Sequence, residues 1–125
     1  MTSGGINFNE KFSKFSERWA PKVIATMNDY EFKLVKIEGD FVWHNHEDTD
    51  EVFIVLEGSM RIDFKDFDVG HVDLMEGEMF VVPKKVFHRP VAEKECKVLL
   101  VEPRGVVNTG DKEEDGLRAP NEVWI

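Results

Sequence analysis

Four residues of this sequence have the types and the spacing of a metal-binding site. Two histidines and a glutamate follow the pattern His44-x-His46-x4-Glu51, and His88 comes much later in the chain. Imidazole nitrogens together with a carboxylate suit a borderline divalent metal ion. Residues two apart on an extended strand point to the same face. His44 and His46 should therefore point together, and a short turn should return Glu51 to that face. The pattern predicts a single metal site.

The length and composition of the chain fit one compact domain. It has 125 residues, of which 42% are hydrophobic and 33% charged, as in ordinary globular proteins. The net charge of −9 disfavours nucleic acid and anionic membrane surfaces as partners. No apolar run approaches the roughly 20 residues of a membrane span, and the first residues lack the pattern of a secretory signal. The single Cys96 cannot form an internal disulfide, so we expect a cytoplasmic protein.

Much of the negative charge lies in two segments, 47–50 and 111–115. We interpret these acidic residues as a solvated surface that favours solubility. The alternative is a second cation site, but the ordered spacing of a calcium-binding loop is missing.

The first 21 residues predict a helical arm. Aromatic residues recur there at steps of four, three and four, which places them on one stripe of a helix: Phe8, Phe12, Phe15 and Trp19. Asn7 or Asn9 could cap this helix, and Pro21 would end it. We expect the stripe to pack on the body of the protein.

Residues 22–103 have the pattern of an all-β domain. Short runs rich in β-branched and aromatic residues alternate with turn signals, which predicts strands at 22–27, 30–37, 41–46, 51–56, 60–64, 71–74, 79–82 and 98–101. Strands at this spacing favour a sandwich or a closed barrel. Residues 104–125 are mostly polar and predict a C-terminal arm, whose apolar end should be held against the body. The whole chain, 1–125, is expected to be one domain.

The motifs around the histidines resemble those of the cupin superfamily, which implies a double-stranded β-helix, or jelly-roll, barrel. The first cupin motif is usually Gly-x5-His-x-His, then three or four residues, Glu, six residues and Gly. It matches from His44 to Gly58, and Gly39 comes one residue closer to His44 than usual. The resemblance covers roughly residues 30–102.

The second cupin motif, Gly-x5-Pro-x-Gly-x2-His-x3-Asn, matches at Gly77, Pro83 and His88. Lys85 replaces its second glycine, and Ala92 takes the place of the asparagine. The chain looks most like small single-domain cupins of bacteria and archaea, often labelled mannose-6-phosphate isomerase-like. Such a label rests on the fold and does not establish a reaction.

Three residues are candidates for the pocket around the metal. Phe53 and Val55 share the strand face of Glu51, so they should line the same cavity. Lys85 stands where a glycine would allow a tight turn, and we expect this turn to have another shape. The alternative is a lysine at the mouth of the barrel that meets an anionic substrate.

Three histidines and one glutamate would fill four positions of a roughly octahedral ion and leave two for water, dioxygen or a chelating substrate. A structural zinc site, by contrast, is closed by four ligands. We therefore expect a metal-dependent enzyme that uses Fe, Mn, Ni or Zn on a small oxygen-rich substrate, as an isomerase, a lyase or a dioxygenase. No catalytic acid or base can be named. The alternative is a non-catalytic module that binds or senses a sugar or an organic acid.

The outer face of one strand predicts the assembly. Val52, Ile54 and Leu56 face away from Glu51 and Phe53, and this apolar row needs a cover. Small cupins commonly dimerise in this way, so we expect a homodimer.

Overall fold

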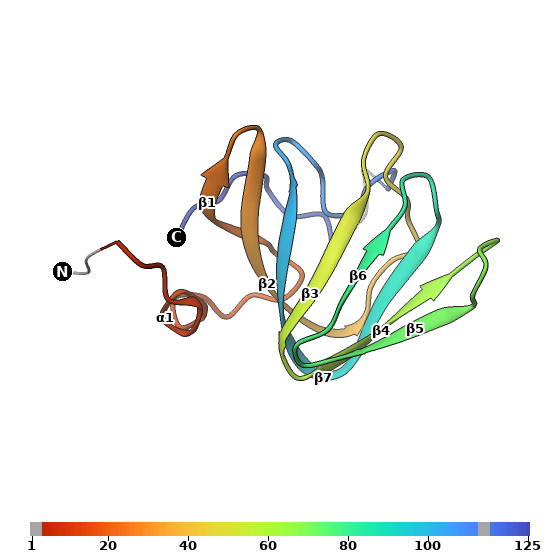
Figure 1. Cartoon of the computed structure of the whole chain (residues 1–125), viewed down its shortest axis with the longest axis horizontal. Coiled ribbons are helices and arrows are strands. Elements are labelled where there is room, and N and C mark those ends of the chain that lie inside the picture. Colours follow the sequence, from red (N-terminus) through yellow and green to blue (C-terminus); the bar gives the residue numbers. More distant parts are fainter. Residues whose placement is uncertain (1–3, 113–115) are drawn as a thin grey trace.

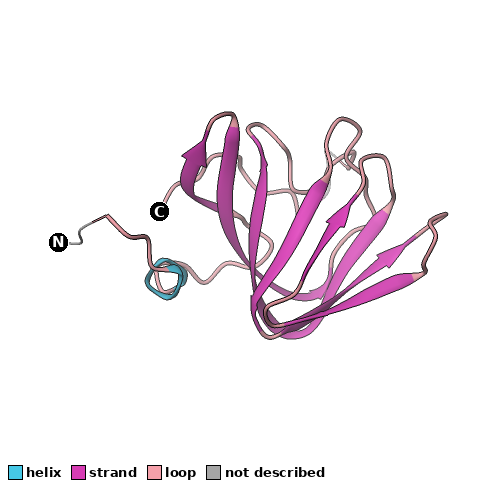
Figure 2. Ribbon diagram, viewed as in Figure 1, coloured by secondary structure: helices cyan, strands magenta, loops and turns pink. Residues whose placement is uncertain are grey.

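The computed structural model describes residues 4–112 and 116–125 as an antiparallel β-barrel with a short N-terminal helix (Figures 1 and 2). The acidic residues Glu113, Glu114 and Asp115 lie outside the described residues. The elements are α1 (Phe8–Phe12), β1 (Lys22–Met27), β2 (Tyr30–Asp40), β3 (Glu51–Glu57), β4 (Ser59–Phe64), β5 (His71–Met75), β6 (Met79–Val82) and β7 (His88–Pro103). The predicted all-β jelly-roll class is confirmed.

Strand β7 joins the two sides of the barrel. In the main sheet the strands follow the order β1-β2-β7-β3-β6, and β4 pairs with both β5 and β7. The C-terminal half of β7 pairs with β3, whereas its first residues, from His88 to Val91, pair with β4. One continuous strand thus takes part in both walls, which Figure 1 shows as the curved strand at the base of the fold.

The interior is filled by side chains that alternate along the strands, as strand geometry requires. On β3, Glu51, Phe53 and Val55 are buried, whereas the residues between them are only half-buried. This confirms the predicted facing of β3. The apolar part of the interior consists of Val35, Ile37, Phe53, Val55, Met60, Ile62, Phe64, Leu74, Val82, Ala92, Cys96, Val98 and Leu100.

The helix α1 is shorter than the aromatic stripe predicts. It begins after Asn7, whose side-chain oxygen accepts a hydrogen bond from the backbone of Glu10, and ends at Phe12. Asn7, and not Asn9, is therefore the cap. Phe12 and Phe15 pack on the outer face of the main sheet, against Leu34 and Leu99. The expected packing of the arm on its own barrel is thus confirmed. The helix, however, covers only the five residues Phe8–Phe12 of the predicted stripe.

Trp19 does not belong to the helix. Its backbone has a left-handed conformation with φ 60°, and its N–H donates to the carbonyl of Lys36 over 2.9 Å. The indole stacks on Phe41 with 4.6 Å between ring centres, and its Nε1–H donates to the carbonyl of Glu38. The helical spacing placed Trp19 on the stripe, but contacts with β2 hold it at the mouth of the barrel instead.

Two other expectations need correction or detail. Residues 41–46 form no regular strand; His44 forms a bridge to His88, and Phe41 N–H donates to the carbonyl of Pro90. The C-terminal end is held against β1, since Val23 N–H donates to the carbonyl of Val123 and Ile125 N–H to that of Val23.

None of the described residues belongs to a helix long and apolar enough to cross a membrane.

The contribution of the arm to stability can be measured with two phenylalanines of α1. Phe12 is buried and Phe8 is 39% exposed. We expect Phe12→Ala to lower the free energy of unfolding by about 3–5 kcal/mol, because it leaves a cavity under the arm. The matched change Phe8→Ala should cost less than about 1 kcal/mol. Urea denaturation measures both, and equal losses would contradict the packing described here.

Candidate metal centre

The four predicted ligands come from three separate segments and meet inside the barrel. His44 and His46 lie in the segment between β2 and β3, Glu51 begins β3, and His88 begins β7. Two backbone hydrogen bonds join the segments, because His44 N–H donates to the carbonyl of His88 and His88 N–H to that of His44. All four residues are buried.

The ligand atoms of these residues converge on one point. One nitrogen or oxygen atom from each residue lies within 4.8 Å of the others. Glu51 Oε1 is 3.1 Å from His88 Nε2 and 3.3 Å from His46 Nε2. An ion about 2.0–2.2 Å from each atom holds its ligand atoms roughly 3–4 Å apart, so small inward movements are enough to bring all four to one ion.

The rings of two histidines are held by backbone carbonyls. His44 Nδ1–H donates to the carbonyl of Val42, and His88 Nδ1–H to that of Val86, each over 2.9 Å. A carbonyl can only accept, so Nδ1 carries a proton in both rings. Nε2 of each ring then faces the centre of the cluster, where His88 Nε2 is hydrogen-bonded to Glu51 Oε1 over 3.1 Å. A cation bound there would replace this hydrogen bond, and backbone carbonyls commonly orient metal-binding histidines in this way.

The electrostatics of the cluster favour a cation at its centre. Burial lowers the pKa of His44 to about 4, and the neighbouring His88 adds to this effect, so His44 stays neutral at pH 7. Burial opposes the ionisation of Glu51, but His46 and then His88 outweigh it and hold the pKa of Glu51 well below its usual range. Burial also opposes a charge on His46, yet Glu51 raises the pKa of this histidine.

The donor set fits a divalent metal ion. His46 Nε2 is buried and has no well-aligned hydrogen-bond partner among the described residues, although Glu51 is near. A buried polar atom without a partner is costly, and a metal ion would satisfy it. Three neutral imidazoles and one carboxylate suit Fe, Mn, Ni or Zn. An ion binds only the deprotonated nitrogen of His46, so metal binding would compete with protonation of this histidine.

A small cavity adjoins the cluster. Its volume is about 40 Å³, which is room for roughly three water molecules. The cavity is lined by Trp19, Pro21, Val35, Ile37, Phe41, His44, Glu51, Phe53, Pro90, Leu100, Glu102 and Asn108. Of the three predicted pocket residues, only Phe53 is in this lining. Val55 lies two residues further along β3 and is fully buried in the apolar core, and Lys85 is exposed.

The turn at Lys85 keeps the left-handed shape that a glycine would favour. Lys85 has φ 71°, so the expectation of another turn shape is wrong. Neighbouring hydrogen bonds fix this conformation: Lys85 N–H donates to the carbonyl of His46 over 2.7 Å, and its own carbonyl accepts from Asn45 Nδ2. The turn thereby supports the segment that carries His44 and His46.

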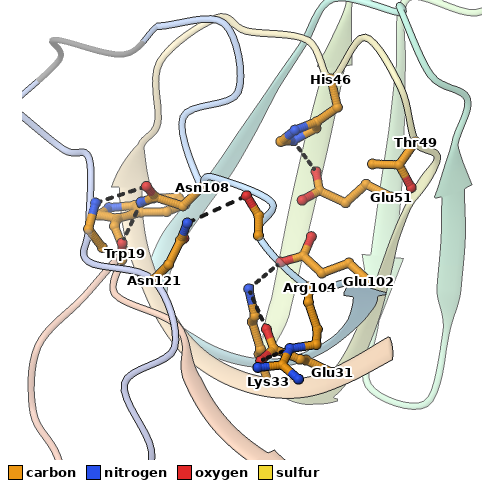
Figure 3. A network of polar contacts seen from close by, with 12 residues as sticks. Trp19, Glu31, Lys33, His46, Thr49, Glu51, Glu102, Arg104, Asn108 and Asn121 are labelled. Atoms are coloured by element: carbon orange, nitrogen blue, oxygen red, sulfur yellow. Dashed lines mark hydrogen bonds and ion pairs between the residues drawn. The ribbon is translucent and has the colours of Figure 1, made fainter. Parts of the chain in front are cut away.

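Both terminal arms contribute walls to the site, which sequence reasoning did not foresee. Asn108 Nδ2 donates to the carbonyl of Trp19, so the C-terminal arm is tied to the N-terminal arm beside the cavity (Figure 3). Gly110 has φ 56°, and a Cβ there would overlap the carbonyl of Asn45 and lie 3.0 Å from the ring of His44. Only glycine allows the arm to approach the segment of His44 and Asn45 so closely.

Glu102 is the other residue of the site that the sequence did not single out. It ends the inward-facing series Val98, Leu100, Glu102 of β7, and all three are buried. The alternation could have revealed it, but the predicted strand stopped at residue 101. Burial raises the pKa of Glu102 to about 7 and the charge of Glu51 adds to this rise, while Lys33 opposes it.

Comparison with known proteins agrees with this fold. The family model of the cupin domain matches residues 31–102. YdbB, an uncharacterised protein of Bacillus subtilis, is 38% identical over 77 residues, which are 62% of this chain and 66% of that protein. A cupin-2 domain protein from Shewanella frigidimarina is 60% identical, with a TM-score of 0.75, over 79% of this chain and 94% of its own.

A more distant structure shares the fold only. Hydroquinone 1,2-dioxygenase from Sphingomonas sp. TTNP3, with 4-hydroxybenzoate bound, is 24% identical with a TM-score of 0.71, over 80% of this chain and 32% of its own. The family match covers more than half of the present sequence, and the inward-facing cluster lies at its two motifs. The chain belongs to the cupin family.

The strain at Lys85 gives a stability test. A left-handed conformation costs a residue with a Cβ about 1–2 kcal/mol, and a glycine at this position would remove that cost. Glycine also gives the unfolded chain more conformational freedom, which offsets part of the gain in stability. We expect Lys85→Gly to raise the free energy of unfolding by about 0.5–1 kcal/mol. Lys84→Gly, next to it but outside the positive-φ positions, should lower it by a similar amount. Thermal unfolding measures the stability of both variants. A lower free energy of unfolding in both would contradict the strain described at Lys85.

Proposed function

We propose that this cupin holds one divalent metal ion through His44, His46, Glu51 and His88 and acts as a metal-dependent enzyme on a small oxygen-rich substrate. The observation that carries the proposal is the position of the cluster. Two of its members, His44 and Glu51, line the cavity, so a ligand in the cavity would lie beside the ion. A purely structural ion needs no such space.

The ion would polarise a bound oxygen as a Lewis acid. The side chains of the protein would orient the ligands of the ion and limit the access of water. His44 and His88 hold fixed orientations through Val42 and Val86. Trp19, Phe41 and Phe53 give the cavity an apolar wall that limits water and strengthens electrostatic interactions with a bound ligand.

The reaction class is an isomerisation, a lyase reaction or a dioxygenation. The Sphingomonas dioxygenase has the same fold but too little sequence in common to select among them, so its activity only suggests the first assay. We also propose a cytoplasmic location, since the single Cys96 is buried and unpaired and fits a reducing compartment.

Metal analysis tests the first part of the proposal. Purified protein should contain, or take up, close to one equivalent of Fe, Mn, Ni or Zn. We expect His44→Ala and His88→Ala each to weaken the binding at least about 100-fold, since loss of even a supporting contact costs 10–100-fold. His71→Ala is the matched control, because His71 is exposed and lies outside the cluster. Elemental analysis and calorimetric titration measure the effect. Equal binding by all three variants would refute the site.

Activity assays test the second part. Oxygen consumption and sugar isomerisation, measured on protein reconstituted with each of the four metals, should reveal turnover that His88→Ala abolishes. If the metal binds as expected and no reaction occurs, the proposal of an enzyme is replaced by the alternative, a non-catalytic module that binds a sugar or an organic acid.

We further propose that the protein is a homodimer. On the outer face of the main sheet, Val52 of β3 pairs with Val81 of β6, and Ile54 pairs with Met79. Met79 and Val81 are 55% and 45% exposed, and such a row of apolar side chains favours a protein partner. Sedimentation should show a dimer for the native protein and a monomer for Val81→Lys. A native protein that sediments only as a monomer would refute this part.

A further inference from the structure

The strongest feature left unexplained is the side chain of Glu102. This residue is 2% exposed. Its Oε1 accepts a hydrogen bond of 3.0 Å from Lys33 Nζ, and Lys33 is itself 3% exposed. Its Oε2 is buried and accepts no hydrogen bond from any residue that the structure describes. One oxygen is thus held by Lys33, and the other is left for a partner that the described residues do not supply.

The register of the strands places Glu102 beside the metal cluster. Leu100 of β7 pairs with Phe53 of β3, and Val101 with Val52, so Glu102 lies opposite Glu51 on the inner wall. Figure 3 shows the two carboxylates one above the other, with Lys33 on the far side of Glu102. Glu102 and Glu51 both line the cavity.

A third buried carboxylate, that of Glu31, lies near Glu102 but does not line the cavity. Glu31 pairs with Glu102 across β2 and β7 and is fully buried. It lies 3.6 Å from Lys33 Nζ and 3.9 Å from Arg104 Nε, and it is absent from the residues that line the cavity. Glu31 faces cations of the chain, whereas Glu102 faces the cavity. Both oxygens of Glu31 also lack a hydrogen bond among the described residues, so the position at the cavity, and not the unpaired oxygen alone, distinguishes Glu102 from Glu31.

A ligand in this cavity meets two kinds of polar group. On one side lies the metal cluster, which attracts an oxygen with a lone pair or a negative charge. On the other lies a carboxylate oxygen without a partner, which can only accept a hydrogen bond when ionised. Apart from Asn108, the remaining wall is aromatic and aliphatic, and the volume of about 40 Å³ admits only a small molecule.

We propose that Glu102 determines the substrate class, because its free oxygen accepts a hydrogen bond from a hydroxyl group of a small ligand whose other oxygen binds at the metal cluster. Lys33 is a positioning residue that fixes the carboxylate in this orientation. The inference rests on the proposed metal site and adds the hydroxyl requirement to it. A site built to hydrogen-bond a hydroxyl group discriminates strongly against an analogue without one.

The test compares two probes on protein loaded with Co(II), whose visible absorption changes when a ligand binds. Glycolate carries a carboxylate and a hydroxyl group, whereas methoxyacetate has a methyl ether in place of the hydroxyl and cannot donate. At about pH 8.5, above the raised pKa of Glu102, we expect the native protein to bind glycolate at least about tenfold more tightly than methoxyacetate, as for a hydrogen bond to a charged group.

Glu102→Gln isolates the cause of this preference. Lys33 only donates, so it should hold the amide oxygen of the substituted side chain and leave the NH₂ group facing the cavity. That group donates equally to a hydroxyl and to an ether, so the preference for glycolate should fall below about threefold while Co(II) binding is unchanged. Size selection alone would leave the preference intact. Glu31→Gln is the matched control and should keep the native preference.

The outcomes separate the two proposals. If the native protein takes up no Co(II), the metal site fails and this inference fails with it. If Co(II) binds, then a native protein that binds neither probe, or does not prefer glycolate, overturns the inference alone. A preference that survives in Glu102→Gln overturns it as well. The comparison of the two probes on the native protein needs no variant, so a failure of Glu102→Gln to fold does not remove the test.

Discussion

The structure depends on one constraint, the burial of polar and ionisable groups inside an apolar barrel. His44, His46, Glu51 and His88 lie in a largely aliphatic and aromatic interior, which also contains the buried charged residues Glu31, Lys33 and Glu102. Burying such groups is costly unless each has a partner. The backbone satisfies part of the need, through the carbonyls of Val42 and Val86 and the reciprocal bonds between His44 and His88. His46 Nε2 is left without a hydrogen bond among the described residues, and the ligand atoms of all four residues gather around one point, which is the physical reason to expect a cation there.

The same reasoning extends from the metal cluster to the opposite wall of the cavity. Lys33 satisfies one oxygen of Glu102 and leaves the other free, so the cavity lies between two sets of incompletely paired polar groups. Its other walls come partly from outside the region that matches the family. Trp19 from the N-terminal arm and Asn108 from the C-terminal arm both line it and are hydrogen-bonded to each other. In this protein the barrel supplies the four clustered residues, and the arms limit the space beside them.

The fold class and the convergence of the four clustered residues could be predicted because both leave local signals. Alternation along β3 separates Glu51, Phe53 and Val55 from the half-buried residues between them, and the spacing of the histidines can be read directly. The helix and the turn at Lys85 could not be predicted in the same way. The aromatic stripe continues to Trp19, but contacts with Lys36 and Glu38 on β2 hold this residue outside any helix. At Lys85, hydrogen bonds to His46 and Asn45 enforce a conformation that a lysine disfavours.

The sequence by itself determined the barrel, the four residues that converge in it and the inward face of β3, because residue spacing and strand alternation are properties of a single segment. Only the tertiary structure decided what surrounds the metal cluster. Glu102 becomes part of the site through the pairing of β7 with β3 and β2, and Trp19 and Asn108 through the meeting of two arms 89 residues apart in sequence. Such neighbours depend on which distant segments pack together, and a local sequence pattern does not contain this information.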